Sequence, residues 1–100
     1  MIARIWHGAV TADKAAEYLR RMREIALPDY RATPGNIGGY VLQRPDGNIT
    51  HFYMLTFRES EEAIAAFAGK PIEVAKYYDF DPDFLIEMEP DATHYQVYDR

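Results

Sequence analysis

β-Branched and aromatic residues are concentrated in three segments of the chain, at residues 2–10, 37–44 and 49–57. Such runs are typical of β-strands. In the first and third segments both alternating sets are apolar or aromatic, which predicts strands that are covered on both faces. The turn sequence Pro45-Asp46-Gly47-Asn48 predicts an antiparallel hairpin between the second and third segments. A last short strand is expected at residues 94–98.

Helical spacing of apolar residues marks the segments between these strands. Residues 12–27 are expected to form an amphipathic helix that ends at Pro28, because proline cannot continue a helix. Its apolar face consists of Ala15, Ala16, Leu19, Met22 and Ala26. A second helix is expected at residues 60–69, followed by a helical turn at 72–77. Residues 79–91 carry six acids, no base and two prolines, so we expect an irregular segment there.

The order β-α-β-β-α-β predicts an α+β fold of the ferredoxin-like, split βαβ type. Right-handed crossovers place its four antiparallel strands in the order 4-1-3-2. Two helices cover only one face of such a sheet, so the apolar second face needs another cover. We expect a homodimer in which two sheets face each other as a dimeric α+β barrel. The alternative is a monomer in which residues 79–91 cover that face.

The length and net charge of the chain limit the number of domains and the kinds of partner that it can bind. One hundred residues suffice for one domain, residues 1–100, with one hydrophobic core. The formal net charge of −5 opposes binding to nucleic acid or to an anionic membrane. The sequence contains no cysteine, no apolar run long enough to span a membrane and no signal-peptide pattern near its start. We therefore expect a cytoplasmic protein.

Histidines and tyrosines are the candidate chemical groups. His51 and Tyr53 share one face of the third strand, and a tight hairpin is expected to bring Tyr40 opposite Tyr53. A histidine near neutrality can accept a phenolic proton, and tyrosine hydroxyls can stabilise an oxyanion. Aromatic packing across the strands is the structural alternative. His7, His51 and His94 could also meet at one end of the sheet and bind zinc, but no neighbouring carboxylate in the sequence supports this, so we expect no metal.

Several segments resemble the antibiotic biosynthesis monooxygenase (ABM) domain family, and the resemblance covers nearly the whole chain. They are Ile2-Ala-Arg-Ile-Trp-His-Gly8, Pro28-Asp-Tyr-Arg-Ala-Thr-Pro-Gly-Asn36, His51-Phe52, Ala63-Ile-Ala-Ala-Phe-Ala-Gly69, Ala75-Lys-Tyr-Tyr78 and His94-Tyr95. The resemblance implies the dimeric α+β barrel that the pattern predicts. The family includes cofactor-independent monooxygenases that oxidise polyketide-like phenols, haem-degrading enzymes and members without a known activity.

The resemblance also suggests site residues. Its haem-degrading branch holds haem through a histidine on the second helical region, and this sequence has no histidine between Ser60 and Asp83. Haem degradation is therefore disfavoured. The branch that oxidises phenols uses Tyr, Trp, Asn and Arg side chains around its substrate. The candidates of those types here are Arg4, Trp6, Asn36, Tyr53 and Tyr77.

The resulting hypothesis is a monooxygenase without a cofactor that acts on a small electron-rich aromatic or polyketide-like substrate. In a pocket between sheet and helices, His51 would deprotonate the substrate, and Tyr53 with Tyr77 or Tyr78 would hold the oxyanion. Arg4, Trp6, Asn36 and Tyr40 would complete the binding site. The alternative is a homodimer without catalytic activity that binds a small ligand or stabilises a partner, and a protein that binds metal through three histidines is a third possibility.

Overall fold

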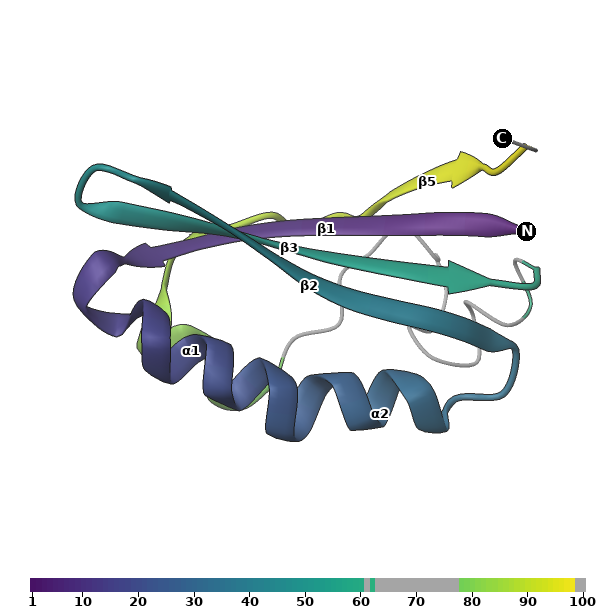
Figure 1. The fold of residues 1–100 in the computed structure, drawn as a ribbon, viewed down its shortest axis with the longest axis horizontal. Helices are drawn as coiled ribbons and strands as arrows, with labels where there is room; N and C mark the ends of the chain where they lie inside the picture. Colours follow the sequence, from purple (N-terminus) through teal and green to yellow (C-terminus); the bar gives the residue numbers. More distant parts are fainter. Residues whose placement is uncertain (61, 63–77, 99–100) are drawn as a thin grey trace.

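The computed structural model describes residues 1–60, 62 and 78–98. A single antiparallel sheet forms one layer, and a run of helical segments lies along one of its faces (Figure 1). The elements are β1 (Ile2–Thr11), η1 (Ala12–Lys14), α1 (Ala15–Arg21), η2 (Met22–Ala26), α2 (Leu27–Ala32), β2 (Asn36–Asp46), β3 (Ile49–Arg58), α4 (Asp81–Phe84), β4 (Leu85–Met88) and β5 (Thr93–Gln96). The expected helix at residues 60–69 and the turn at 72–77 lie outside the described residues, except for Ser60 and Glu62.

The sheet has the expected topology with one difference. Its order is β2-β3-β1-β4, and β5 pairs with the same strand as β4, which confirms the order 4-1-3-2 with the fourth strand divided in two. β4 pairs with residues 8–10 and β5 with residues 2–5 of β1. Pro90 lies between the two pieces and has no N–H to donate to the ladder, which explains the interruption. Residues 79–91, expected to be irregular, thus contain α4 and β4.

The first helical run continues beyond its expected end. Pro28 was expected to stop the helix, but it lies in the first turn of α2, which continues to Ala32. The turn before it, η2, is a π-helix, in which the Leu27 N–H donates to the Met22 carbonyl five residues earlier. A wider turn of this kind accommodates the proline ring and removes the need for its missing N–H.

The β2–β3 hairpin has a shorter connection than the sequence suggested. Asp46 pairs with Ile49, so only Gly47 and Asn48 form the loop, and Gly47 has a φ of 63°. Glycine adopts this left-handed conformation without steric cost. In this register Tyr40 lies opposite Leu55 and Leu42 opposite Tyr53, so the expected pairing of Tyr40 with Tyr53 is wrong by two residues.

Alternation along β1 and β3 separates two faces, which we call the helix side and the open face. The helix side holds the core, where Trp6, Val10, Phe52 and Met54 pack against Tyr18 and its helical neighbours. In β3 every second residue from Thr50 to Arg58 is buried, whereas the residues between them are half-buried. Three large side chains on the open face are exposed, Tyr40, Leu42 and Tyr95. The described part of 79–91 lies at the sheet edge and against α1, so it does not cover the open face as the monomer alternative required.

Candidate functional site

Two arginines and two tyrosines form a polar group within the helix side, which we call the helix-side cluster: Arg4, Arg58, Tyr30 and Tyr78. Arg58 is fully buried and Arg4 is 3% exposed. The guanidinium carbon of Arg58 lies 5.8 Å from the ring centre of Tyr30, a distance suited to a cation–π contact. The rings of Tyr30 and Tyr78 are 6.2 Å apart. The end of the sheet near Arg4 and Arg58 therefore has a cationic, aromatic interior beneath α2.

Burial governs the titration of this cluster. It lowers the pKa of both guanidinium groups from 12.5, although arginine stays charged in proteins. Burial raises the pKa of Tyr30 to about 12 and also raises the pKa of Tyr78. Both phenols are thus neutral hydrogen-bond donors at neutral pH. The Tyr78 hydroxyl donates to Asp29 Oδ2 at 2.7 Å, which fixes its ring against α2.

A buried carboxylate positions the chain beside Tyr78. Asp81 is 2% exposed, accepts the Tyr78 backbone N–H at 2.8 Å and accepts the Tyr18 hydroxyl at 3.0 Å. Burial raises the pKa of Asp81 from 3.8, and the two hydrogen bonds oppose that shift. The carboxylate therefore connects residue 78 to α1 through the core.

Trp6 and His94 border the helix-side cluster. Trp6 is 5% exposed, and its indole N–H donates to the Glu89 carbonyl at 2.9 Å. The indole covers Gly8, where an added Cβ would lie 2.5 Å from the ring, so this position requires glycine. His94 pairs with Arg4 across β1 and β5, and directly paired residues point to the same face. His94 is the histidine that the fold places on the helix side.

A surface pocket opens next to Tyr78. Its volume is about 490 Å³, and it is lined by Arg21, Ile25, Tyr78, Asp79, Phe80 and Asp83. This volume lies within the range of about 300–1,000 Å³ that is typical of sites for small molecules. Tyr78 belongs to both the pocket and the helix-side cluster, so the pocket adjoins this cluster.

The open face carries a different group, the histidine pair His7 and His51. His7 Nε2 lies 2.9 Å from His51 Nδ1, and the ring centres are 5.1 Å apart. Each outer nitrogen contacts a carboxylate: His7 Nδ1 is 3.1 Å from Glu89 Oε1, and His51 Nε2 is 3.2 Å from Asp46 Oδ2. The two rings thus form the centre of a row of four polar side chains.

Two more side chains adjoin this pair. The Tyr53 ring centre lies 4.8 Å from that of His7, its partner in the ladder. Glu87 lies on β4 opposite Ala9, and Ala9 also pairs with His51. Ligand atoms of His7, His51 and Glu87 all lie within 4.8 Å of one another. Because the Ala9 side chain is small, it leaves room between His51 on β3 and Glu87 on β4.

The structure divides the residues predicted from the sequence between the two faces. Arg4, Trp6 and Tyr78 lie on the helix side, whereas His51, Tyr53 and Tyr40 belong to the open face. The expectation that His51 and Tyr53 line a pocket between sheet and helices is therefore wrong, because side chains at odd positions of β3 point away from the helices.

The remaining predicted residues have other positions. Asn36 Nδ2 donates to the Tyr30 carbonyl and its Oδ1 accepts the Gly38 N–H at 2.8 Å, so Asn36 holds the turn between α2 and β2. Tyr77 lies outside the described residues. His94 faces the helix side, so the three histidines do not cluster, yet His7 and His51 do meet. The carboxylates of Glu89 and Asp46 contact the two rings, and the sequence analysis did not predict these contacts.

Sequence reasoning did not select several residues that the fold brings into these sites: Tyr30, Arg58, Asp29, Asp81, Glu87 and Glu89. Arg58 offered one signal, because a charged residue that continues the alternation of a buried strand is expected to point inward. The acids in residues 79–91 offered none, since the side-chain partners of Asp81 and Glu89 are 63 and 82 residues away in the chain.

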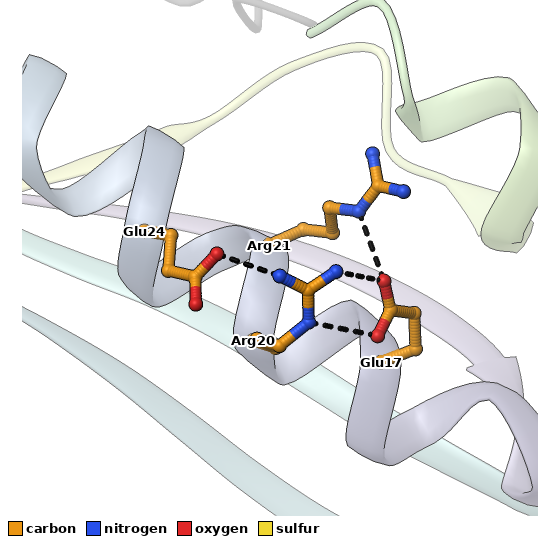
Figure 2. A network of polar contacts seen from close by, with 4 residues as sticks. All are labelled: Glu17, Arg20, Arg21 and Glu24. Carbon is orange, nitrogen blue, oxygen red and sulfur yellow. Dashed lines mark hydrogen bonds and ion pairs between the residues drawn. The ribbon is translucent and has the colours of Figure 1, made fainter.

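A network of ion pairs on α1 and η2 lies on the outer surface (Figure 2). Arg20 bonds to Glu17 and, at 2.7 Å, to Glu24, while Arg21 Nε donates to Glu17 Oε1 at 3.1 Å. Glu17 and Arg21 are four residues apart, a spacing that brings two side chains together on one face of a helix. Arg20 thus has two acidic neighbours on the surface and belongs to neither site, whereas Arg21 also lines the pocket beside Tyr78.

No family model matches the sequence, and no curated protein matches it either. Solved structures do match. A "Putative antibiotic biosynthesis monooxygenase" from Nitrosomonas europaea aligns with a TM-score of 0.71 and 22% identity over 97% of this chain and 98% of that one. The heme-degrader MhuD from Mycobacterium tuberculosis, with two hemes in its active site, aligns with a TM-score of 0.63 and 21% identity over 97% and 95%. An MhuD mutant with two manganese protoporphyrin IX groups per active site aligns with a TM-score of 0.61 and 21% identity over 97% of this chain and 94% of that one.

These alignments extend over almost the full length of each chain, as the resemblance in sequence does. They confirm the resemblance at the level of architecture: this chain has the ferredoxin-like α+β fold of the antibiotic biosynthesis monooxygenase and MhuD structures.

Proposed function

We propose that the chain is a monooxygenase that oxidises a small electron-rich aromatic without an organic cofactor, with the substrate bound at the helix-side cluster. The observation that carries this proposal is the burial of Arg4 and Arg58 beside the phenols of Tyr30 and Tyr78. Buried cations stabilise an anionic substrate much more strongly than exposed ones, because the local dielectric is low. A phenolate or enolate is the anion that an aromatic substrate would supply.

The reaction needs a base, and His94 takes that role in place of His51. It lies on the same face as Arg4, whereas His51 lies on the other side of the sheet. His94 removes a proton from the substrate CH₂ or phenol, and the resulting anion passes one electron to O₂. Superoxide and the substrate radical then join through a new C–O bond. The peroxide loses water as its O–O bond breaks, so CH₂ and O₂ become C=O and H₂O.

Two neighbours of similar fold are described as heme-degraders, yet a phenolic substrate fits this chain better. The sequence has no histidine between residues 60 and 83, and the His7–His51 pair faces away from the helices. The pocket beside Tyr78 and Phe80 has a volume of about 490 Å³, which is enough for an aromatic of a few rings.

Oxygen uptake by purified metal-free protein tests this proposal. The substrates are anthrones, hydroquinones and flavonoid-like phenols, with the uncatalysed oxidation of each subtracted. We expect saturable uptake that falls about 10²-fold or more in His94→Gln, as is usual for loss of a general base. Tyr98→Phe, at an 84% exposed position outside the site, is the control and should leave the rate unchanged.

The His51→Gln variant separates the two candidate bases. If it abolishes turnover while His94→Gln does not, the catalytic site is on the open face and the helix-side assignment is wrong. Uptake no faster than background across the panel would instead favour a dimer that binds a ligand without catalysis.

We also propose that a second copy of the chain covers the open face. Tyr40, Leu42 and Tyr95 are 46–58% exposed there, next to the half-buried side chains of Leu55 and Phe57. An apolar sheet face of this kind is self-complementary when two copies meet around a two-fold axis. Light scattering coupled to gel filtration should give twice the monomer mass, and Leu42→Asp should give the monomer mass. A monomeric native chain would disprove this assembly.

A further inference from the structure

Beyond the proposed oxygenase, we infer that the open face holds a site for a divalent transition metal, with His7, His51 and Glu87 as ligands. The facing nitrogens of the two rings, His7 Nε2 and His51 Nδ1, lie 2.9 Å apart, and a Glu87 carboxylate oxygen completes a group within 4.8 Å. Two histidines and one carboxylate are a common set for zinc or non-haem iron.

Counting protons supports a cation between the rings. Ionised carboxylates only accept hydrogen bonds, so Glu89 requires a proton on His7 Nδ1 and Asp46 requires one on His51 Nε2. Two neutral imidazoles carry two protons in total, and these outer bonds use both. The inner nitrogens then face each other with lone pairs. A third proton or a metal ion between the rings would satisfy both lone pairs.

The outer contacts match the usual surroundings of a metal-bound histidine. A ligating histidine typically donates its second N–H to a carboxylate or carbonyl, which fixes the tautomer and orients the ring. Glu89 and Asp46 provide this contact for both rings here. Bond lengths of about 2.0–2.2 Å to zinc place ligand atoms about 3.3 Å apart in a tetrahedron. The two nitrogens would therefore move apart by a few tenths of an ångström, and the rings would turn so that both lone pairs point at the ion.

Glu87 favours a metal over a third proton. It is exposed on β4, so its side chain can swing toward the rings across Ala9, which is fully buried and small. The side chains of His7 and His51 are 18% and 13% exposed in the single chain, which leaves space for water as a fourth ligand. Site geometry thus provides three ligands of mixed N and O type, a set that Ca²⁺ and Mg²⁺ do not prefer.

Metal titration of the chelator-treated protein tests the site. Zn²⁺ is added in a calorimeter, and Co²⁺ is followed by visible absorption, which reports its coordination geometry. We expect one Zn²⁺ per chain, loss of binding in the His7→Gln/His51→Gln double variant and at least tenfold weaker binding in Glu87→Gln. Asp46→Asn should weaken binding about 10–100-fold through the orientation of His51.

His94→Gln is the matched control, because it removes a histidine from the other face. It should bind Zn²⁺ as the native chain does, and circular dichroism verifies that each variant is folded. Absence of Zn²⁺ binding by the folded native chain would overturn the inference and leave a shared proton between the rings. Binding that persists in the double variant would overturn it as well. Neither result depends on oxygen uptake, so the proposed function stands or fails separately.

Discussion

The helix-side cluster and the histidine pair use the same two strands but differ in almost every physical respect. Arg4 and His7 belong to β1, and Arg58 and His51 belong to β3. On the helix side, fully buried guanidinium groups meet neutral phenols, while on the open face half-buried imidazoles meet exposed carboxylates. Side-chain alternation therefore gives one pair of strands two chemistries, and burial decides which groups each face can hold.

The two faces should differ most in how much stability is lost when an aromatic ring is removed. Phe52→Ala on the helix side removes a fully buried ring and should lower the free energy of unfolding by about 3–5 kcal/mol. The adjacent Tyr53→Ala on the open face should cost about 1 kcal/mol. Urea unfolding at one protein concentration measures both. Equal losses would mean that the Tyr53 ring is packed as tightly as the core.

High pH should reveal the burial of Tyr30. Its pKa is raised from 10.0 to about 12, so folding favours the protonated phenol. This contribution is fully present below pH 10 and is lost as the pH rises through about 12. The free energy of unfolding should fall by about 2–3 kcal/mol more in the native chain than in Tyr30→Phe. Parallel pH profiles of the two proteins would contradict the assigned burial.

A smaller effect is expected from Tyr78→Phe. The variant removes the hydroxyl that donates to Asp29 Oδ2, a bond to a charged acceptor, and should lower the free energy of unfolding by about 1–2 kcal/mol. Thermal unfolding measures the change, with the exposed Tyr98→Phe as reference. No change in either variant would show that the Tyr78 ring is held by packing alone.

The smallest effect is expected on the outer surface. Hydrogen bonds from Arg20 and Arg21 lower the pKa of the exposed Glu17 to about 2, so its contribution is present above pH 4.5 and is lost as the pH falls through about 2. Glu17→Gln should lower the melting temperature slightly at low salt and not at all at high salt, because salt screens exposed pairs. Glu24→Gln, which loses one bond, should change it less. A shift that persists at high salt would contradict a screened surface pair.

Strand positions and topology were predictable because they depend on local patterns. Alternation, the Asp46-Gly47-Asn48 turn and the helical spacing after Thr11 each act over a few residues, and the expected sheet order is confirmed. The effect of Pro28 was mispredicted because the π-helix before it lets the helical run continue through the proline. No pattern in the sequence indicates this π-helix.

The sites were less predictable because they depend on which face meets the helices. The residues near His51 do not indicate whether the odd or the even positions of β3 face the helices. If the other set faced the helices, every side chain of the strand would lie on the opposite face. Placing Glu89 beside His7 requires the β1–β4 pairing and the break at Pro90, which join residues 82 apart. Long-range contacts of this kind follow from the complete fold rather than from a motif.

Glu89 contacts both faces at once, and this gives the protein an internal optical reporter. Its carbonyl accepts the indole N–H of Trp6, its N–H donates to the His7 carbonyl at 3.3 Å, and its carboxylate bonds to the His7 ring. Trp6 is the single tryptophan of the chain. Indole fluorescence responds to the strength of its hydrogen bond, so any event that moves Glu89 on the open face should change the emission of a ring on the helix side, with no added label.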